Sequence, residues 1–389
     1  MERLHIGIYG SVNSGKSSLI NRLAGQNIAI VSATAGTTAD AVKKTIELEG
    51  IGPAVLIDTA GINDETALGA ARVGATLNTL DIIDMAIIVA DSGHLTPRDI
   101  DLAGALKERK IPFFIINNKS DLPGFKPLSF GDNDVLPFSA MNAADIKPVL
   151  ALIKKHKPAH LSQKQILLDD IVGRGDIVVL VAPIDDAAPA GRLILPQVNA
   201  IRNLLDNHAV AIVLQPGELA AFLKQNVKIK LVVVDSQVFK EVNEILPREI
   251  PLTSFSILFA RMKGDFNLYL EGVKAIDKLK DGDNILILES CTHSATTCAD
   301  IGRVKLPALL QKKTGKKLNF KIIPGLDSLP QDLSAYALVL QCGGCMVTRN
   351  QLMTRISRAR EAGVPITNYG IAIAYCSGIL DRVIEIFRR

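Results

Sequence analysis

The chain has 389 residues, of which 48% are hydrophobic and 22% charged, and its formal net charge is +4. This length allows two or three domains with their own cores, and this hydrophobic content excludes a disordered chain. No apolar run approaches the ~18 residues that span a bilayer, and five cysteines are too few for a disulfide framework.

The first residues enter a strand directly, without the basic and apolar segments of a signal peptide. The small basic excess is scattered along the chain and does not indicate nucleic-acid binding. We therefore expect a cytoplasmic protein whose partners include neither a membrane nor a nucleic acid.

Strand-like and helical patterns alternate along the whole chain, which predicts an α/β protein of three domains, each with a mainly parallel sheet flanked by helices. In the first domain, 1–163, strands are expected at residues 6–10, 55–57, 85–89 and 112–117. In the second, 164–250, strands are expected at 177–182, 209–214 and 230–234, with a helix at 197–205. In the third, 251–389, helical stretches at 251–258 and 273–279 precede strands at 284–288, 320–323 and 336–340.

The second domain contains no phosphate-binding loop and no acid–base pair after its first strand. An assembly domain is therefore a better interpretation than a second active site. An exposed edge strand would let two copies join in a continuous sheet, so we expect a homodimer.

A phosphate-binding loop occupies residues 10–17, which match G-x-x-x-x-G-K-S/T between a strand and an amphipathic helix. Backbone N–H groups and the helix N-terminus hold phosphates in such a loop. Lys16 reaches the outer phosphates, and the Ser17 hydroxyl binds Mg²⁺. The nucleotide-binding residues expected in this loop are Gly10, Asn13, Ser14, Gly15, Lys16, Ser17 and Ser18.

Asp58 and Gly61 follow the second predicted strand. An aspartate there can hold Mg²⁺ through water, and the glycine can bring its backbone N–H close to the terminal phosphate. These two residues extend the predicted nucleotide site.

Two further motifs predict that the nucleotide is GTP. Asn118, Lys119 and Asp121 end another strand, where the Asp121 carboxylate can accept two hydrogen bonds from guanine that adenine cannot donate. Ser139 and Ala140 supply small residues that contact the base. Four motifs in this order predict a GTPase.

This motif set, with residues 21–26 and the segment 31–40, resembles the translation-factor-related GTPases of the TrmE–Era type. The resemblance implies that Thr38 binds Mg²⁺ and that Asn13 ligates a stimulating K⁺, so Lys16, Asn13 and Thr38 are the expected catalytic set. Ile62 stands where Ras-like proteins carry a water-orienting glutamine. Because isoleucine cannot orient water, we expect slow intrinsic hydrolysis.

Three cysteines form a second candidate site. Cys291 follows the strand at 284–288, and Cys342 follows the strand at 336–340, three residues before Cys345. The carboxyl ends of parallel strands meet at one edge of a sheet, so we expect these segments to come together. The intervening Gly343 and Gly344 would let the backbone wrap closely around a metal centre.

The residue chemistry leaves the metal open. With His293, the cysteines could close a Cys₃His zinc site, or three thiolates could hold a [4Fe–4S] cluster with one exchangeable position. His293 could also be only a hydrogen-bonding neighbour of a ligand. Cys298 and Cys376 are ambiguous, because a lone cysteine is more often a small buried hydrophobe.

Residues 289–293, 301–307, 342–346 and 364–375 in combination resemble the HydF family of [FeFe]-hydrogenase maturation GTPases, and the resemblance covers nearly the whole chain. It implies a GTPase domain, a dimerisation domain and a cluster domain with a [4Fe–4S] cluster on Cys291, Cys342 and Cys345. It further implies a scaffold that accepts a transient di-iron precursor from radical-SAM maturases and delivers it to apo-[FeFe]-hydrogenase.

One residue departs from that family. Histidine usually precedes the C-x-x-C pair, and this chain has Gln341 there. An amide is a poorer iron ligand than imidazole, so we expect a labile fourth position, filled by water, His293 or a nearby carboxylate.

Two other functions compete with this interpretation. An RNA- or ribosome-associated GTPase with a structural zinc lacks support, because no G-x-x-G clamp follows residue 165 and only 4% of residues are aromatic. A redox enzyme with Cys342 and Cys345 as a dithiol would leave Cys291 and the GTPase motifs without a role.

Overall fold

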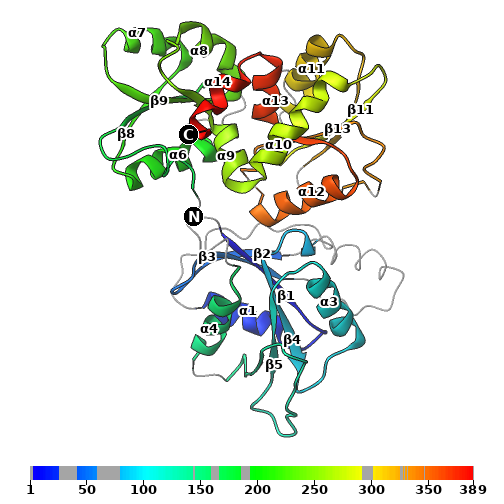
Figure 1. The fold of residues 1–389 in the computed structure, drawn as a ribbon. Coiled ribbons are helices and arrows are strands. Elements are labelled where there is room, and N and C mark those ends of the chain that lie inside the picture. The colour runs from blue at the N-terminus through cyan, green and yellow to red at the C-terminus, as the bar shows by residue number, and fades with distance from the viewer. Residues whose placement is uncertain are drawn as a thin grey trace. The chain divides into compact units, whose positions relative to one another are not determined.

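The computed structural model describes residues 3–25, 42–58, 79–142, 145–158, 166–184, 193–290, 301–324, 327, 329–330, 332–345 and 347–388. The chain divides into two compact units, Met1–Gln165 and Ile166–Arg389 (Figure 1). None of the helices in these described ranges is long and apolar enough to cross a membrane.

The first unit contains a six-stranded sheet in the order β2-β3-β1-β4-β5-β6, in which only the edge strand β2 is antiparallel to its neighbour. Its strands are β1 Leu4–Tyr9, β2 Val42–Leu48, β3 Gly52–Asp58, β4 Met85–Asp91, β5 Phe113–Asn118 and β6 Val135–Pro137. Its helices include α1 Lys16–Ala24, α3 Pro97–Glu108 and α4 Lys147–His156.

Helices cover both faces of this sheet, which explains why its central strands are apolar at nearly every position. Ile6 and Ile8 of β1 pack in one cluster with residues of α1 and α4. Tyr9 packs on the opposite face with Leu106 of α3. Both faces bury their side chains, so the parallel sheet predicted from the continuous apolar runs is confirmed.

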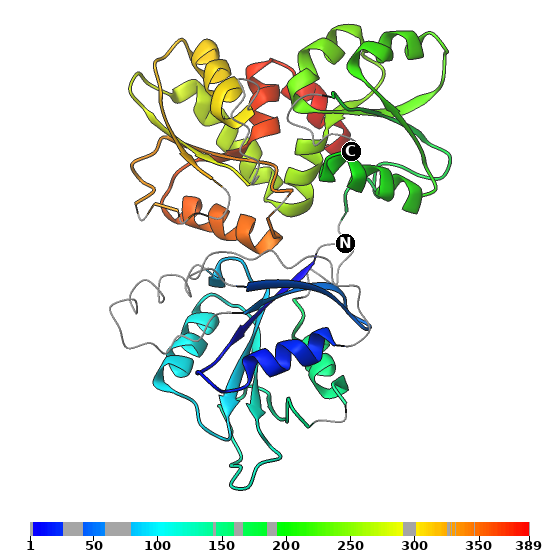
Figure 2. The same cartoon turned by 180° about the vertical axis from the view of Figure 1, so that it is seen from behind.

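The second unit contains two four-stranded parallel sheets, in the orders β10-β9-β7-β8 and β12-β11-β13-β14. Figure 2 shows this unit, coloured from green to red, from behind. The strands of the first are β7 Ile177–Val181, β8 Val210–Leu214, β9 Ile229–Val234 and β10 Leu252–Ser254. The strands of the second are β11 Asn284–Leu288, β12 Asn319–Ile323, β13 Leu338–Gln341 and β14 Ile366–Asn368. All three sheets are mainly parallel, as the sequence predicted.

The helices of the second unit connect most of these strands, but no described helix lies between β12 and β13. They are α6 Leu195–Asp206, α7 Leu219–Leu223, α8 Phe239–Ile245, α9 Phe255–Lys263, α10 Phe266–Gly272, α11 Leu306–Thr314, α12 Arg349–Glu361, α13 Tyr369–Cys376 and α14 Leu380–Ile384. Shorter 3₁₀ or π turns occur at Pro216–Glu218, Ser236–Val238, Val273–Lys278, Ile301–Lys305 and Glu385–Phe387.

The two sheets of this unit share packed side chains around α9. Leu258 of α9 belongs to the same cluster as Val178 of β7. Ile257, its neighbour, belongs to a larger cluster that joins residues of β9 and β11. The helix therefore contributes to the cores of both sheets.

The helix expected at residues 251–258 is wrong in its first part. Leu252–Ser254 is the short strand β10, which pairs with β9, and α9 begins only at Phe255. The Ser254 hydroxyl accepts a hydrogen bond from the Ile257 backbone N–H, so the serine ends the strand and caps the helix. A three-residue strand is too short to show a period of two.

Candidate functional site

The loop between β1 and α1 has the backbone of a phosphate-binding site. Gly10 and Gly15 have φ values of +144° and +97°. A Cβ on Gly10 would lie 2.3 Å from the Val89 carbonyl oxygen, and one on Gly15 would lie 2.0 Å from Asn118 Nδ2. Both positions therefore require glycine, for conformation and for space.

Lys16 is folded back over this loop. Its Nζ donates to the carbonyl oxygens of Gly10 at 2.9 Å and Ser11 at 2.7 Å, and the residue is 7% exposed. Burial lowers the pKa of Lys16 and raises the pKa of Asp58, while the attraction between them opposes both shifts. The opposing effects show that the Lys16 ammonium and the Asp58 carboxylate lie near each other beside the loop.

Two buried oxygens at this site fit a phosphate and a hydrated metal ion. Within the described part of the chain, Ser14 Oγ and Asp58 Oδ1 have no hydrogen-bond partner. A buried polar atom without a partner is costly, so such atoms commonly engage a ligand, an ion or a water. The first turn of α1 contains no acidic residue, which leaves its positive end available to an anion.

Asn118, at the end of β5, connects three of the predicted motifs. It is 3% exposed, its Nδ2 donates to the Ser14 carbonyl oxygen at 2.7 Å, and its Oδ1 accepts from the Ala140 N–H at 2.9 Å. The asparagine thus holds the phosphate loop and the 139–142 loop in one arrangement.

Asp121, the residue predicted to recognise guanine, is held by a set of hydrogen bonds. A hydrogen bond from Ser139 is the main cause that lowers its pKa, and backbone and Asn142 hydrogen bonds act in the same direction. Asn142 Nδ2 lies 2.6 Å from Asp121 Oδ2, and its backbone N–H donates to Ser139 Oγ at 3.0 Å. These hydrogen bonds favour the ionised carboxylate, which accepts hydrogen bonds only.

Sequence reasoning missed three supporting polar residues. Asn142 orients Asp121, and Asp91 accepts a hydrogen bond of 2.8 Å from Lys119 Nζ. Asn117 accepts from the Gly93 N–H at 2.6 Å and is completely buried. Asn142 was detectable as a polar residue two positions after Ala140, whereas the partners of Asp91 and Asn117 come from distant loops.

Cys342 and Cys345 lie on a turn at the carboxyl end of β13. The Cys342 N–H donates to the Leu288 carbonyl oxygen at 2.9 Å, which extends the contact with β11 past the end of the strand. Gly344 has φ +70°, and a Cβ there would lie 2.5 Å from Leu352 Cδ1. Both cysteines are half-buried on this turn, which requires glycine at 344.

Gln341 is completely buried and is directed toward β11. Its Nε2 donates to Ser290 Oγ at 3.1 Å and to the Cys342 carbonyl oxygen at 3.2 Å. The amide therefore ties together the two strand ends that lead to the cysteines.

Two arginines bind Glu289, the residue that follows β11. Arg303 forms a bidentate pair with the Glu289 carboxylate, with both N···O distances 2.9 Å. Arg355 Nη1 donates to the Glu289 carbonyl oxygen at 3.1 Å. The carboxylate nearest to Cys291 in sequence is thus engaged by a guanidinium group.

Several predicted residues lie outside the described ranges, namely Thr38, Gly61, Ile62, Cys291, His293 and Cys298. In the described ranges, no three His, Cys, Asp or Glu side chains gather as a metal site. Two thiols three residues apart on a tight turn fit either a zinc ion or an iron–sulfur cluster. Burial raises the pKa of Cys376 to about 11, which disfavours the thiolate form that a metal ligand needs.

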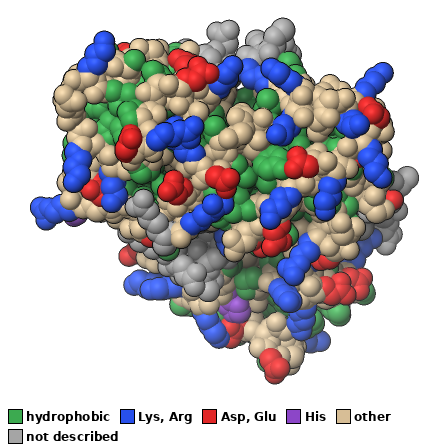
Figure 3. All heavy atoms as spheres, turned by 45° about the horizontal axis from the view of Figure 1, so that its top comes forward, with side chains coloured by type: hydrophobic (Ala, Val, Ile, Leu, Met, Phe, Trp, Pro, Cys, Tyr) green, Lys and Arg blue, Asp and Glu red, His purple; other side chains and the backbone are tan. Residues whose placement is uncertain are grey.

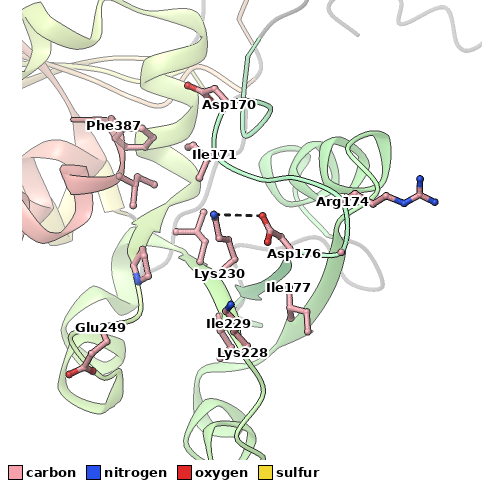
Figure 4. Close-up of a pocket in the computed structure, with 14 residues that line it drawn as sticks. Asp170, Ile171, Arg174, Asp176, Ile177, Lys228, Ile229, Lys230, Glu249 and Phe387 are labelled. Carbon is pink, nitrogen blue, oxygen red and sulfur yellow. Dashed lines mark ion pairs between the residues drawn. The ribbon is translucent and has the colours of Figure 1, made fainter. Parts of the chain in front are cut away.

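An open hollow of about 710 Å³ lies at the amino ends of β7 and β9 (Figure 4). Its lining carries both signs of charge, including Lys230 and Asp176 at 3.8 Å, and contains none of the predicted site residues. Ligands of parallel sheets gather at the opposite, carboxyl ends of strands. We therefore do not assign the nucleotide or metal function to this hollow.

Comparison with known families divides the chain into three segments. Residues 5–119 match a family described as 50S ribosome-binding GTPase. Residues 167–264 match the hydrogen maturase F dimerization domain, and residues 267–386 match the hydrogen maturase F tetramerization domain. The predicted GTPase is confirmed, and the tetramerization match is a feature that sequence reasoning had not predicted.

Similar individual proteins cover smaller parts of the chain. A tRNA modification GTPase MnmE from Nitrosomonas europaea is 37% identical over 162 residues, which are 40% of this chain and 35% of that protein. MnmE from a Janthinobacterium species is 43% identical over 131 residues, which are 32% of this chain and 27% of that protein. The chain thus spans 35% and 27% of the length of these two relatives.

A solved structure of an Era point variant from Aquifex aeolicus, bound to GDP and AlF4⁻, is 18% identical. The alignment covers 63% of this chain and 99% of that chain, with a TM-score of 0.33.

Proposed function

The chain belongs to the hydrogen maturase F family, and on that premise we propose that this hydrogenase maturation GTPase is a cluster carrier. It holds a [4Fe–4S] cluster, accepts a di-iron precursor from radical-SAM maturases and delivers it to apo-[FeFe]-hydrogenase. GTP binding and hydrolysis switch the carrier between states rather than performing chemistry on the cargo.

Cys291, Cys342 and Cys345 would hold the cluster. The observation that supports this best is the junction of the ends of β11 and β13, where Gln341 bonds to Ser290 and the Cys342 N–H bonds to Leu288. A cluster on three thiolates supplies one iron with an exchangeable coordination position. An amide is a poorer iron ligand than imidazole, so water, His293 or a carboxylate, rather than Gln341, would fill that position.

The nucleotide partners are GTP with Mg²⁺, and K⁺ as the activating ion. Ser17, Thr38 and Asp58 serve the Mg²⁺, and Lys16 serves the outer phosphates. Asn13 has φ +64° in the phosphate loop and is exposed, which suits a side chain that supplies an oxygen to K⁺. Intrinsic hydrolysis is slow because Ile62 cannot orient water.

The assembly unit is a homodimer joined through β8. This strand ends the sheet β10-β9-β7-β8, and its Val210 and Val213 are 46% and 43% exposed. Leu205, on the preceding helix α6, is 59% exposed. No described strand pairs with the outer side of β8, and an edge of this kind with apolar side chains is suited to pairing with a second copy.

The functional division into 1–163, 164–250 and 251–389 remains a proposal, since β10 and α9 connect the second and third parts.

The cytoplasmic location and the absence of a nucleic-acid partner also remain predictions. On the face shown in Figure 3, the described Lys and Arg side chains are interspersed with Asp and Glu rather than gathered in one basic patch. Mixed charge of this kind gives little support to an RNA-binding surface.

Anaerobic purification of the full chain tests the carrier proposal. We expect iron and sulfide with broad absorbance near ~400 nm, a loss of both in Cys342→Ser, and retention in the matched control Cys376→Ser. The loaded protein, after incubation with the maturases, should then activate apo-hydrogenase. A colourless protein with stoichiometric zinc would reject the carrier and favour the RNA- or ribosome-associated GTPase.

Two further measurements test the role of K⁺ in hydrolysis and the lability of the fourth coordination position. Hydrolysis should be faster in K⁺ than in Na⁺, and Asn13→Ala should remove the difference. Imidazole should change the EPR spectrum of the reduced cluster, and an unchanged spectrum would argue against a labile fourth position.

A further inference from the structure

Lys263, the last residue of α9, is buried against the cysteine turn. The residue is 5% exposed. Its Nζ donates to the carbonyl oxygens of Gly344 at 3.2 Å and Val347 at 3.0 Å. These carbonyl groups flank Cys345, so one ammonium group spans the turn that carries this cysteine.

The contact is reciprocal. Arg349, the first residue of α12, donates from Nη1 to the carbonyl oxygens of Met262 at 3.1 Å and Lys263 at 3.2 Å. The end of α9 thus binds the cysteine turn, and the residue just after that turn binds the end of α9. Helix carbonyls that lack intrahelical partners are satisfied in this way.

Burying an ammonium group is costly unless its donors are bonded, and a hydrogen bond from a charged donor is stronger than a neutral one. Gly344, at φ +70°, presents its carbonyl to that ammonium. Lys263 therefore holds the backbone of the turn through the carbonyl oxygens of Gly344 and Val347.

We propose that Lys263 is a positioning residue that preforms the Cys342–Cys345 turn before metal binds and places a fixed positive charge beside the metal centre. The second half rests on the proposed cluster function. A nearby positive charge stabilises the more negative, reduced state of an iron–sulfur cluster, since charge and hydrogen bonding around the cluster set its potential.

Hydrogen exchange of the metal-free full chain tests whether Lys263 preforms the Cys342–Cys345 turn. In Lys263→Met, the amides of residues 342–348 should exchange about ten-fold faster, because a hydrogen bond to a charged group is lost. Lys263→Arg, which keeps a cationic donor, should restore most of the protection. The matched control is Arg382→Met, which removes a buried cation bonded to the carbonyls of Leu246 and Pro247 and should leave the turn unchanged.

A second variant covers the case in which Lys263→Met does not fold. Arg349→Met breaks the other side of the reciprocal contact and should also speed exchange in the turn. Unchanged exchange in every folded variant of Lys263 and Arg349 would overturn the positioning role.

Redox titration of the iron-loaded protein tests the second half. At a fixed potential, Lys263→Met should lower the ratio of reduced to oxidised cluster, and Lys263→Arg should not. A ten-fold change in that ratio corresponds to 59 mV for a one-electron couple. An unchanged ratio in Lys263→Met would reject the electrostatic role of Lys263. A wild-type protein that contains no iron would reject the cluster function, but it would not affect the conclusion from hydrogen exchange.

Discussion

Replacing Asn118 by alanine should both destabilise the first unit and weaken GTP binding. The side chain makes two buried hydrogen bonds, to the Ser14 carbonyl oxygen and from the Ala140 N–H. Each partner left without a hydrogen bond costs about 1–3 kcal/mol. The free energy of unfolding should therefore fall by roughly 2–6 kcal/mol, a large share of the ~5–15 kcal/mol that holds a typical domain together.

GTP affinity should fall at least ten-fold, since about 1.4 kcal/mol corresponds to a factor of ten. The phosphate loop and the 139–142 loop would no longer be held in register before GTP arrives. Native-state hydrogen exchange in residues 3–25 reports the stability of this unit separately from the second unit. A fluorescent GTP analogue reports the affinity.

The matched control is Asn133→Ala, which removes one hydrogen bond to the Phe130 carbonyl oxygen in a surface turn. It should change the free energy of unfolding by less than about 0.5 kcal/mol and leave GTP binding intact. Asn118→Asp should be as harmful as Asn118→Ala, because a carboxylate would face the Ser14 carbonyl oxygen. A GTP affinity within two-fold of wild type in Asn118→Ala would refute the reasoning.

Three further outcomes are expected. Hydrogen bonding in the folded state lowers the pKa of Asp121, so any stability that its carboxylate contributes is present above the unfolded pKa and is lost as the pH falls through the lower folded pKa. Ser139→Ala should therefore move the acid limit of GTP binding to higher pH. An unmoved limit would contradict the role of Ser139 in lowering this pKa. Val213→Glu should convert the dimer to a monomer, as measured by light scattering. The control Ile100→Glu alters a similarly exposed apolar residue of α3 and should leave the dimer intact. A dimeric Val213→Glu variant would exclude the β8 interface. Cys376 should react slowly with thiol reagents at pH 8, because burial raises its pKa to about 11, and fast labelling of the folded protein would contradict its burial. The stability that this thiol contributes is complete below pH ~9 and is lost as the pH rises toward 11.

Features carried by neighbouring residues could be predicted from the sequence. The phosphate loop was recognisable because its glycines, lysine and serine lie within eight consecutive residues. The parallel sheets were recognisable because strands buried on both faces are apolar throughout. Cys342 and Cys345 were identified as one turn for the same reason, since Gly343 and Gly344 separate them.

Features that depend on distant residues were decided only by the tertiary structure. Asn118 meets Ser14 across 104 positions, and Lys263 meets Gly344 across 81 positions, so no local pattern marks either pair. The role of Gln341 changed for the same reason: its neighbours suggested a missing ligand, and its position shows a buried amide that joins β13 to Ser290. The sequence determined which chemical groups this protein carries, because motifs and periodicity are local properties. Packing between distant residues determined which of those groups hold the others in place.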